Sequence, residues 1–360
     1  MSVVSLGMPT LPRRASDPLE ARPVGEDVWE GPLVDRFGRV HKDLRISLTD
    51  KCNLRCTYCM PAEGVQWLPK QNLLTTDEIE RVASVLARLG IEEIRLTGGE
   101  PLLRPDIVDV VGRLSTLHGP FGPLEISMTT NAIRLDRKVE QLVEAGLTRV
   151  NISLDTVNPE RFKNLTRRER FEDVVLGIEA ARDAGLHPLK LNAVAMRNVN
   201  DDEFCDLLRF AVKYQAELRF IEQMPLDAGH TWSRHTMVPG QEILDQLSSE
   251  FSLAPKGERG ASPAEVFTVD GGPATVGVIA SVTAPFCGAC DRVRLTADGQ
   301  LRNCLFARDE SDLLTLMRGG CTDEQIAAMV RSSIEAKLPG HGINDPGFLQ
   351  PDRPMSAIGG

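Results

Sequence analysis

From residue 43 onward, short runs of Val, Ile and Leu alternate with amphipathic stretches of ten to fifteen residues. This alternation is typical of repeated β-then-α units, in which each helix returns the chain to a parallel sheet. The pattern therefore predicts an α/β fold with six parallel strands, at 44–49, 92–96, 124–128, 149–154, 189–195 and 217–222.

The helix predicted from Thr76 has the clearest start and stop signals. Thr75 and Glu78 have the spacing of a capping box, and Gly90 is placed to end the helix. One apolar face at helical spacing is formed by Ile79, Val82, Leu86 and Leu89. Similar helices are predicted at 106–117, 136–145, 171–184 and 202–214.

Polar positions within the strands distinguish two parallel architectures. In the first strand, apolar residues share one face, while Arg45, Ser47 and Thr49 share the other. Polar residues recur in this way in three later strands, as Arg95, Lys190 with Asn192, and Arg219. A doubly wound sheet, covered on both faces, would be nearly all apolar. The pattern favours an incomplete (β/α)6 barrel whose lumen holds a charged ligand, and simple pairing of these bases with neighbouring acids is the alternative.

The pattern changes on both sides of this region. Residues 1–40 contain five prolines and four glycines without sustained periodicity, and after Met224 the β–α alternation stops. Residues 276–304 predict β structure, with a hairpin turn at 297–299. We therefore predict a flexible leader (1–40), the barrel (41–228), a separate C-terminal module (229–345) and a flexible tail ending in Gly-Gly (346–360).

The composition is that of an ordinary globular protein. Of 360 residues, 42% are hydrophobic and 26% are charged, which excludes a wholly disordered, fibrous or membrane-embedded chain. The net charge of −10 argues against nonspecific binding to the phosphates of nucleic acid, but a few arginines could still hold a small anion. The beginning of the chain has no apolar signal core. We predict a cytoplasmic protein that binds neither nucleic acid nor membranes.

The cysteines are the most informative residues. Six of the eight fall into two groups of three, and in a reducing compartment such grouping suggests metal before disulfides. The first triad, Cys52, Cys56 and Cys59, is spaced C-x3-C-x2-C directly after the first strand, at the sheet edge where α/β folds place their sites. Three thiolates on one loop suit a [4Fe–4S] cluster with one iron free of protein ligands. Structural zinc, the alternative, needs a fourth ligand that this loop does not provide.

The second triad, Cys287, Cys290 and Cys304, has the spacing C-x2-C-x13-C and spans the predicted hairpin. Taken alone, this spacing also suits a zinc ribbon that lacks one ligand. Beside the first triad, it favours a second three-cysteine iron–sulfur cluster. Cys205 and Cys321 belong to neither triad, and we interpret them as ordinary core or surface residues.

Several motifs resemble those of radical S-adenosylmethionine enzymes. The loop C-N-L-R-C-T-Y-C at 52–59 resembles the signature loop of that superfamily, and T-G-G-E-P at 97–101 resembles its glycine-rich strand end at the methionyl group. Within the superfamily, residues 41–360 resemble the family that cyclises GTP for molybdenum cofactor biosynthesis. The motifs of this closer likeness are C-x2-C-D-R-V-R at 287–294, Cys304, T-T-N at 129–131, N-I-S-L-D at 151–155, F-I-E-Q-M at 220–224 and the terminal Gly-Gly.

The resemblance implies a role for each matching residue. It gives two [4Fe–4S] clusters, bound by Cys52, Cys56 and Cys59 and by Cys287, Cys290 and Cys304. The first three cysteines, with Arg292 and Arg294, form the implied catalytic set. S-adenosylmethionine is implied to lie among Tyr58, Gly99, Ser153 and Met224. GTP is implied to be held by Arg45, Arg95, Thr129, Lys190, Arg292, Val293 and Arg294.

The implied activity is that of a lyase that converts GTP to (8S)-3′,8-cyclo-7,8-dihydroguanosine 5′-triphosphate, the first step of molybdenum cofactor biosynthesis. The implied partners are GTP, a reducing electron donor of the flavodoxin or ferredoxin type, and cyclic pyranopterin monophosphate synthase downstream, and the family allows a homodimer. The sequence contains no Gly-Lys dipeptide and hence no Walker loop, so arginine forks and a lysine must neutralise the phosphates. The resemblance also implies that the Gly359-Gly360 tail enters the active site.

Two other functions stay open at this point. One is a radical enzyme acting on a peptide, although only five cysteines follow Cys59 and just three of them are grouped. The other is a zinc-binding protein without enzymatic activity. The sequence departs from the GTP-cyclising family at Ala132, where we expect glycine, and in its longer leader.

Overall fold

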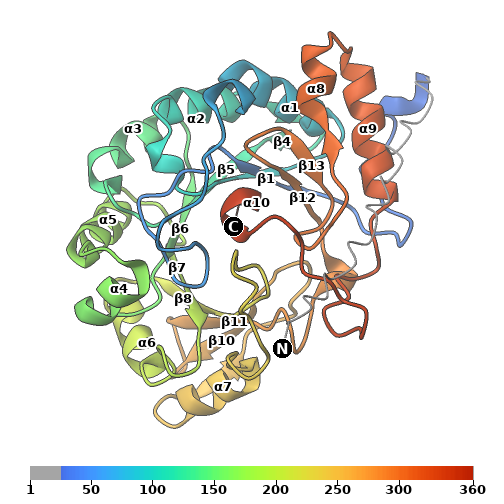
Figure 1. The fold of residues 1–360 in the computed structure, drawn as a ribbon. Coiled ribbons are helices and arrows are strands. Elements are labelled where there is room, and N and C mark those ends of the chain that lie inside the picture. Colours follow the sequence, from blue (N-terminus) through green and yellow to red (C-terminus); the bar gives the residue numbers. More distant parts are fainter. Residues whose placement is uncertain (1–25, 360) are drawn as a thin grey trace, which may run out of the picture.

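The computed structural model describes residues 26–359, whose main element is a curved sheet of twelve strands. Figure 1 shows parallel strands wrapped into an incomplete barrel with helices on its outside. The six barrel strands are β1 (Asp43–Ser47), β2 (Glu93–Thr97), β5 (Glu125–Thr130), β6 (Arg149–Ser153), β7 (Lys190–Ala195) and β8 (Glu217–Glu222). All six predicted strands are confirmed, with bounds that differ by at most two residues.

The barrel helices also follow the prediction, with one addition. Those at predicted places are α1 (Thr76–Arg88), α2 (Ile107–Ser115), α3 (Val139–Glu144), α5 (Phe171–Asp183) and α6 (Phe204–Lys213). Thr75 and Glu78 form the predicted capping box at α1. The additional helix, α4 (Pro159–Thr166), begins after Asn158, whose side chain accepts hydrogen bonds from two backbone N–H groups of the first turn. The Asn-Pro pair explains this start, because Asn caps the first turn and Pro fits the first helical position.

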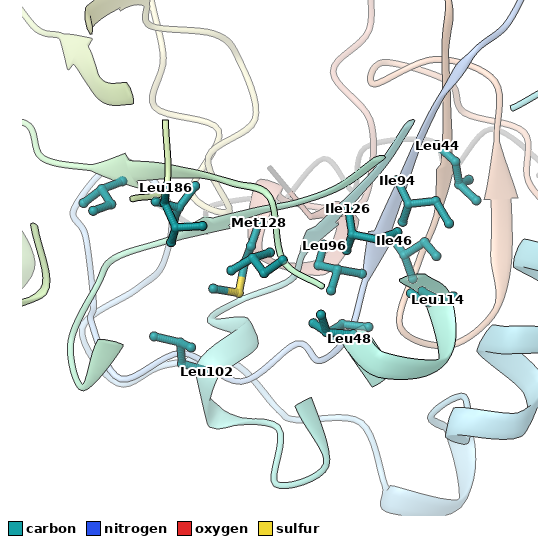
Figure 2. Packing of buried hydrophobic residues seen from close by; sticks show 14 of the residues in the cluster. Leu44, Ile46, Leu48, Ile94, Leu96, Leu102, Leu114, Ile126, Met128 and Leu186 are labelled. Carbon is teal, nitrogen blue, oxygen red and sulfur yellow. The ribbon is translucent and has the colours of Figure 1, made fainter. Parts of the chain in front are cut away.

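The core lies between the strands and the helices around them. Figure 2 shows the alternate apolar residues of β1, β2 and β5 gathered with Leu114 of α2. The strand residues labelled there are Leu44, Ile46, Ile94, Leu96, Ile126 and Met128, all fully buried. Burial of one such side chain stabilises the fold by about 1.5–3 kcal/mol. Because side chains alternate along a strand, this packing turns Arg45, Arg95 and the other polar positions into the lumen.

The predicted C-terminal module is present, but it is not separated from the barrel, because its strands join the barrel sheet. β11 (Thr275–Ile279) pairs in parallel with β8, and β12 (Arg292–Leu295) pairs in parallel with β1. Both edges of the six-stranded sheet would otherwise present unpaired backbone groups. The predicted hairpin is confirmed: β12 pairs antiparallel with β13 (Gln300–Arg302), and Gly299 turns with a φ of +75°.

The remaining elements extend these edges and cover them. Beyond β11 lie β10 (Glu265–Val269) and β9 (Leu253–Pro255), and beyond β13 lies β14 (Ser311–Asp312). The other helices after β8 are α7 (Gly240–Ser248), α8 (Leu313–Arg318), α9 (Asp323–Glu335) and α10 (Met355–Ile358). β3 (His118–Gly119) and β4 (Gly122–Pro123) form a small sheet of their own. No helix among the described residues is long and apolar enough to cross a membrane.

The prediction of a flexible leader over residues 1–40 is wrong for its last part, while residues 1–25 lie outside the described residues. Residues 26–41, here called the N-terminal arm, pack against α1 and α9. The arm begins with a 3-10 helix at Glu26–Trp29, and its Leu33 is fully buried. Arg331 of α9 donates hydrogen bonds to four carbonyl oxygens of the arm, at positions 28, 30, 31 and 32.

The tail runs into the centre of the barrel, where Figure 1 shows α10 and the C-terminus surrounded by the strands. The backbone oxygen of Gly359 accepts a hydrogen bond of 3.0 Å from Nη1 of Arg294 on β12. The end of the tail is thus a short helix in the barrel mouth, with Ser356 and Ile358 buried, which corrects the prediction of a flexible tail at its end. Gly360 lies outside the described residues.

Candidate active site

Two cavities lie at the carboxyl ends of the barrel strands, where the sequence placed the site. The smaller, of about 160 Å³, is lined by the first cysteine triad, Gly99, Asn131 and the tail residues Met355 and Ser356. The larger, of about 270 Å³, is lined by the second triad, Met224, Arg292 and Arg294. Five residues line both cavities: Tyr58, Thr129, Ser153, Asp155 and Met355. The cavities are therefore neighbours across a wall one side chain thick.

The first triad is half-buried, in surroundings that disfavour free thiolates. Burial raises the pKa of Cys52 to about 11 and that of Cys59 to about 12, although hydrogen bonds involving Ser356 oppose the rise at Cys59. Burial also raises the pKa of Cys56, and the nearby Asp155 carboxylate adds to the rise. A bound metal deprotonates a coordinating thiol outright, so three half-buried cysteines that line one cavity fit the ligand set of a cluster.

The arrangement of the triads does not resemble a preformed site for a single ion. Among residues 26–359, no group of three or more His, Cys, Asp or Glu side chains is placed to hold one metal ion. All eight cysteines are free. The donor type and spacing of the triads fit clusters, and each triad has three sulfurs for a group that takes up to four protein ligands.

Two glycines let the cysteine loop pack onto the end of β2. A Cβ at Gly99 would lie 2.3 Å from the carbonyl oxygen of Lys51, and one at Gly98 would lie 2.6 Å from that of Thr49. Gly98 also has a φ of +147°. The close approach of the two backbones is the physical reason for both glycines.

Glu100 fixes the opposite wall of the smaller cavity. Its buried carboxylate accepts hydrogen bonds from Oγ1 of Thr130 and the backbone N–H of Asn131, both at 2.7 Å. Burial raises the pKa of Glu100 to about 7. Asn131 in turn donates to Oδ1 of Asn53 in the cysteine loop at 2.7 Å. Asn131 was absent from the predicted site residues, although it belongs to the T-T-N motif.

Tyr58 and Asp155 form the wall between the cavities. The Tyr58 hydroxyl donates to Asp155 at 2.9 Å, and the same carboxylate accepts from the backbone N–H of Val194 at 2.8 Å. Burial raises the pKa of Asp155 to about 6 and raises that of Tyr58 well above its usual value. Asp155 was also missed from the predicted site residues, and its signal was the last residue of the N-I-S-L-D motif.

The larger cavity collects most of the predicted substrate residues. It is lined by Arg45, Arg95, Thr129, Arg292 and Arg294, together with Arg219 and Asn192. Lys190 lies outside this lining. Val293 also lies outside this lining, because neighbours on a strand point to opposite faces and its side chain is buried in the hydrophobic core.

Carboxylates accompany several of these bases, so the alternative of local ion pairs is partly correct. Arg219 donates to Glu217 at 2.7 Å, Arg95 pairs with Glu93, and Asp43 lies 3.6 Å from Arg45 and 3.5 Å from Arg292. The bases of the lumen still outnumber its acids: they are Arg45, Arg95, Arg149, Lys190, Arg219, Arg292 and Arg294, against Asp43, Glu93, Glu125 and Glu217.

This excess of positive charge lowers the pKa values of several of the bases. Burial and neighbouring positive charges lower the pKa of Lys190 to about 8 and that of Arg294 to about 10. The same two causes lower the pKa of Arg45, against the attraction of Asp43. An anion in the larger cavity would relieve this repulsion, so the site is prepared for a multiply charged anion.

The second triad lies among positive charges. Although burial raises it, the charges of Lys337 and Arg292 hold the pKa of Cys290 below its usual value. Burial raises the pKa of Cys287. Cys205 lies in α6 and Cys321 directly before α9, and neither lines the two cavities, in agreement with their interpretation as ordinary residues.

Ala132 occupies the position where we expected glycine, and the backbone there explains the expectation. Its φ is +63°, in the left-handed region that favours glycine, and its side chain is fully buried. Across from it, a Cβ at Gly177 would lie 2.4 Å from the Ala132 carbonyl oxygen. This chain therefore keeps the loop shape with a strained alanine opposite a glycine of α5.

Comparisons with known proteins agree with this geometry. Residues 46–211 match the radical SAM superfamily, and residues 216–343 match the family described as Molybdenum Cofactor Synthesis C. The chain is 57% identical to a GTP 3′,8-cyclase of Streptomyces coelicolor over 91% of this chain and 96% of that protein. It is 52% identical to a GTP 3′,8-cyclase of a Mycobacterium species (strain KMS) over the full length of both.

Solved structures support the fold. The structure of Streptococcus suis SuiB is similar to this chain with a TM-score of 0.53 and 14% sequence identity. The similarity covers 79% of this chain and 65% of SuiB. At this identity the likeness concerns the fold alone, and it agrees with the incomplete barrel described above.

Proposed function

The chain belongs to the family of GTP 3′,8-cyclases, the radical S-adenosylmethionine enzymes of the first step of molybdenum cofactor biosynthesis, and we propose that its two cavities hold the two reactants side by side. Membership of the radical SAM superfamily implies a [4Fe–4S] cluster and S-adenosylmethionine. In this proposal Cys52, Cys56 and Cys59 bind that cluster. Tyr58, Gly99 and Ser153 then surround S-adenosylmethionine in the smaller cavity, and Met224 reaches it from the larger one.

The wall shared by the two cavities carries the proposal. When bound, the cluster and S-adenosylmethionine supply a carbon radical that can remove hydrogen from the ribose of GTP. The chain's own part is to hold the ribose against that wall, with Thr129, Ser153 and Asp155 as its polar groups. Met355 of the tail also lines both cavities, so it would exclude water from the space between the reactants.

The basic lumen would bind the triphosphate, which carries about four negative charges at neutral pH. Arg292 and Arg294 point from one face of β12 into the larger cavity, and Arg45 lies beside Arg294 in register on β1. Arg95 completes the ring around the cavity, and Lys190 lies deeper in the same lumen. Val293 would add a backbone contact between the two arginines.

The second triad would bind a second [4Fe–4S] cluster, which would supply an iron without a protein ligand for the purine. Cys287, Cys290 and Cys304 all line the larger cavity, so this cluster would close the end of the substrate site. In domain terms, residues 41–228 would carry the radical chemistry and residues 229–345 would complete the substrate site, within one continuous sheet. The proposal keeps the flavodoxin or ferredoxin type of electron donor, the downstream cyclic pyranopterin monophosphate synthase, the cytoplasmic location and the homodimer from the family.

Anaerobic reconstitution followed by product analysis tests this function. With GTP, S-adenosylmethionine and a reductant, we expect 5′-deoxyadenosine and a cyclised guanosine triphosphate in equal amounts. Replacing GTP with ATP is the control and should give no cyclised nucleotide. Cleavage of S-adenosylmethionine without any cyclised product from GTP would contradict the proposal and would favour a peptide substrate.

A further inference from the structure

We propose that Lys337, held in place by His41 of the N-terminal arm, is a positioning residue that donates to Cys290 and raises the reduction potential of the second cluster. This inference rests on the proposed second cluster, and it gives a function to the part of the leader that the sequence left unexplained. It is carried by contacts among buried groups from three distant segments: the N-terminal arm, the Cys287–Cys290 loop and the end of α9.

Lys337 places an ammonium group beside the second triad. It is only 3% exposed, and its Nζ lies 3.6 Å from Sγ of Cys290 and 3.4 Å from the Cys290 carbonyl oxygen. The same nitrogen donates to the carbonyl oxygen of Arg292 at 2.9 Å. An ammonium group has three donors, so one donor remains for Cys290 beside those directed at Arg292 and His41.

The N-terminal arm fixes this nitrogen. Nε2 of His41 lies 2.9 Å from Nζ of Lys337, and the His41 ring is fully buried. Since Lys337 can only donate, Nε2 is the acceptor and the ring is the neutral Nδ1-protonated tautomer. Two residues before it, Arg39 donates to the carbonyl oxygens of Cys287, Leu338 and Pro339 at 2.7–3.0 Å. Through these hydrogen bonds, the arm connects the Cys287–Cys290 loop to the segment that follows α9.

The charges around Cys290 imply a direction for the effect. Nη1 of Arg292 lies 3.9 Å from the same sulfur, so two cations approach one ligand. Reduction adds negative charge to a cluster, and nearby cations and N–H donors to sulfur stabilise the reduced state. Groups that orient metal ligands from outside typically change metal affinity by about 10- to 100-fold when removed. Lys337 should thus affect both the potential and the retention of the second cluster.

The test isolates the second cluster in the full chain by replacing Cys52, Cys56 and Cys59 with Ala. In this background, Lys337→Met should shift the midpoint potential, measured by an EPR-monitored redox titration, to more negative values. Iron release to a chelator should become about tenfold faster. Lys337→Gln, which removes the charge but keeps an N–H donor, should give an intermediate potential, and it tests the inference if the methionine variant does not fold.

Arg331→Met is the matched control, since Arg331 anchors the same arm from α9 through carbonyl oxygens outside the triad. It should leave the potential unchanged. An unchanged potential in both Lys337 variants, or an equal shift in the Arg331 variant, would overturn the inference. If the background variant with intact Lys337 holds no iron at all, the second triad binds no cluster independently of the first, which distinguishes failure of the proposed function from failure of this inference.

Discussion

The two cysteine triads offer the same ligands in opposite electrostatic surroundings. Around the first triad, burial and the carboxyl groups of Glu100 and Asp155 raise the pKa values of all three thiols, although the charge of Arg55 opposes the rise at Cys52. Around the second, Lys337 and Arg292 approach Cys290, whose pKa is lowered against its burial. Burial raises the pKa of Cys287 as well, so the contrast concerns the side of the triad that faces the cations.

The contrast matches two different tasks. A cluster among carboxyl groups is harder to reduce and is therefore a stronger reductant once reduced, as cleavage of S-adenosylmethionine requires. A cluster among cations keeps its negative charge balanced beside an anionic substrate. Two positions with identical side chains can thus differ in chemistry because of the groups that the fold places behind them.

The strongest test of the comparison is removal of one triad at a time. Replacing Cys52, Cys56 and Cys59 with Ala should leave roughly half the iron and abolish 5′-deoxyadenosine formation, because the triads lie in separate segments. Replacing Cys287, Cys290 and Cys304 should remove the other half and abolish cyclisation. Iron, sulfide and product analyses provide the measurement. Loss of all iron in either variant would show that the triads depend on one shared site.

Changes at Arg292 and Arg294 should have a smaller effect. They test whether these arginines bind the triphosphate independently of the cluster at the second triad. Arg294→Ala should weaken GTP binding by about 10- to 100-fold, the loss of one charge-assisted contact of roughly 1.5–3 kcal/mol, with a smaller effect on guanosine. Arg292→Lys keeps the charge but loses the fork, so its affinity should fall between those of wild type and Arg292→Ala. The measurement is the anaerobic affinity of each variant for GTP and for guanosine, at the same iron content as wild type. Equal losses for GTP and guanosine would move these arginines to the base or ribose.

The tail joins the two regions, since Ser356 lies at the first triad and Gly359 at Arg294. Gly359→Ala should lower cyclisation roughly tenfold, because its Cβ would lie 2.7 Å from Oγ1 of Thr97 and its φ is +88°. Deleting Gly359 and Gly360 should also lower cyclisation while sparing both clusters. Gly347→Ala is the matched control, with no atom within 4 Å of the added Cβ. Full turnover in the Gly359 variant would make the tail a simple terminus.

The smallest effect on turnover is expected from a change at His41, which contacts Lys337. This change should alter the stability of the fold at acidic pH. Burial, followed by the charge of Lys337, lowers the pKa of His41 from 6.5 to about 4. The unfolded chain binds this proton first, so stability should fall as pH drops below about 6.5 and the loss is complete near pH 4. At pH 5 the cost is about 2 kcal/mol relative to pH 7.

His41→Gln keeps an acceptor for Lys337 without titrating, so denaturant unfolding at pH 7 and pH 5 should show about 2 kcal/mol less acid destabilisation than in wild type. Activity at pH 7 should remain close to that of wild type. An unchanged acid loss in the variant would show that other groups cause it.

The strands and helices of the barrel were predictable because their signals are local. Apolar alternation located the six barrel strands within two residues, and the Thr75–Glu78 capping box started α1. The first triad and T-G-G-E-P were readable for the same reason, since each lies on one short segment. Asp155 and Asn131 were missed as site residues because their roles depend on partners far along the chain, Tyr58 and Asn53.

The structure of segments that depend on distant partners could not be predicted from the sequence. The N-terminal arm looked like a flexible leader, because its order comes from Arg331 and Leu89 rather than from its own periodicity. The C-terminal strands looked like a separate module, because parallel pairing of β12 with β1 joins segments more than two hundred residues apart. The periodicity of hydrophobic residues is a local signal, and it does not show which strands pair when they lie far apart in the sequence.

The sequence by itself determined which residue types are available: two cysteine triads, a glycine-rich strand end and basic positions on the lumen face of the strands. These follow from spacing and from the alternation of side chains, which are properties of the local chain. Only the tertiary structure decided that Lys337 and Arg292 approach Cys290, while Asp155 lies near Cys56. Charge acts through space and burial strengthens it, so the difference between the two triads depends on distances that no local pattern contains.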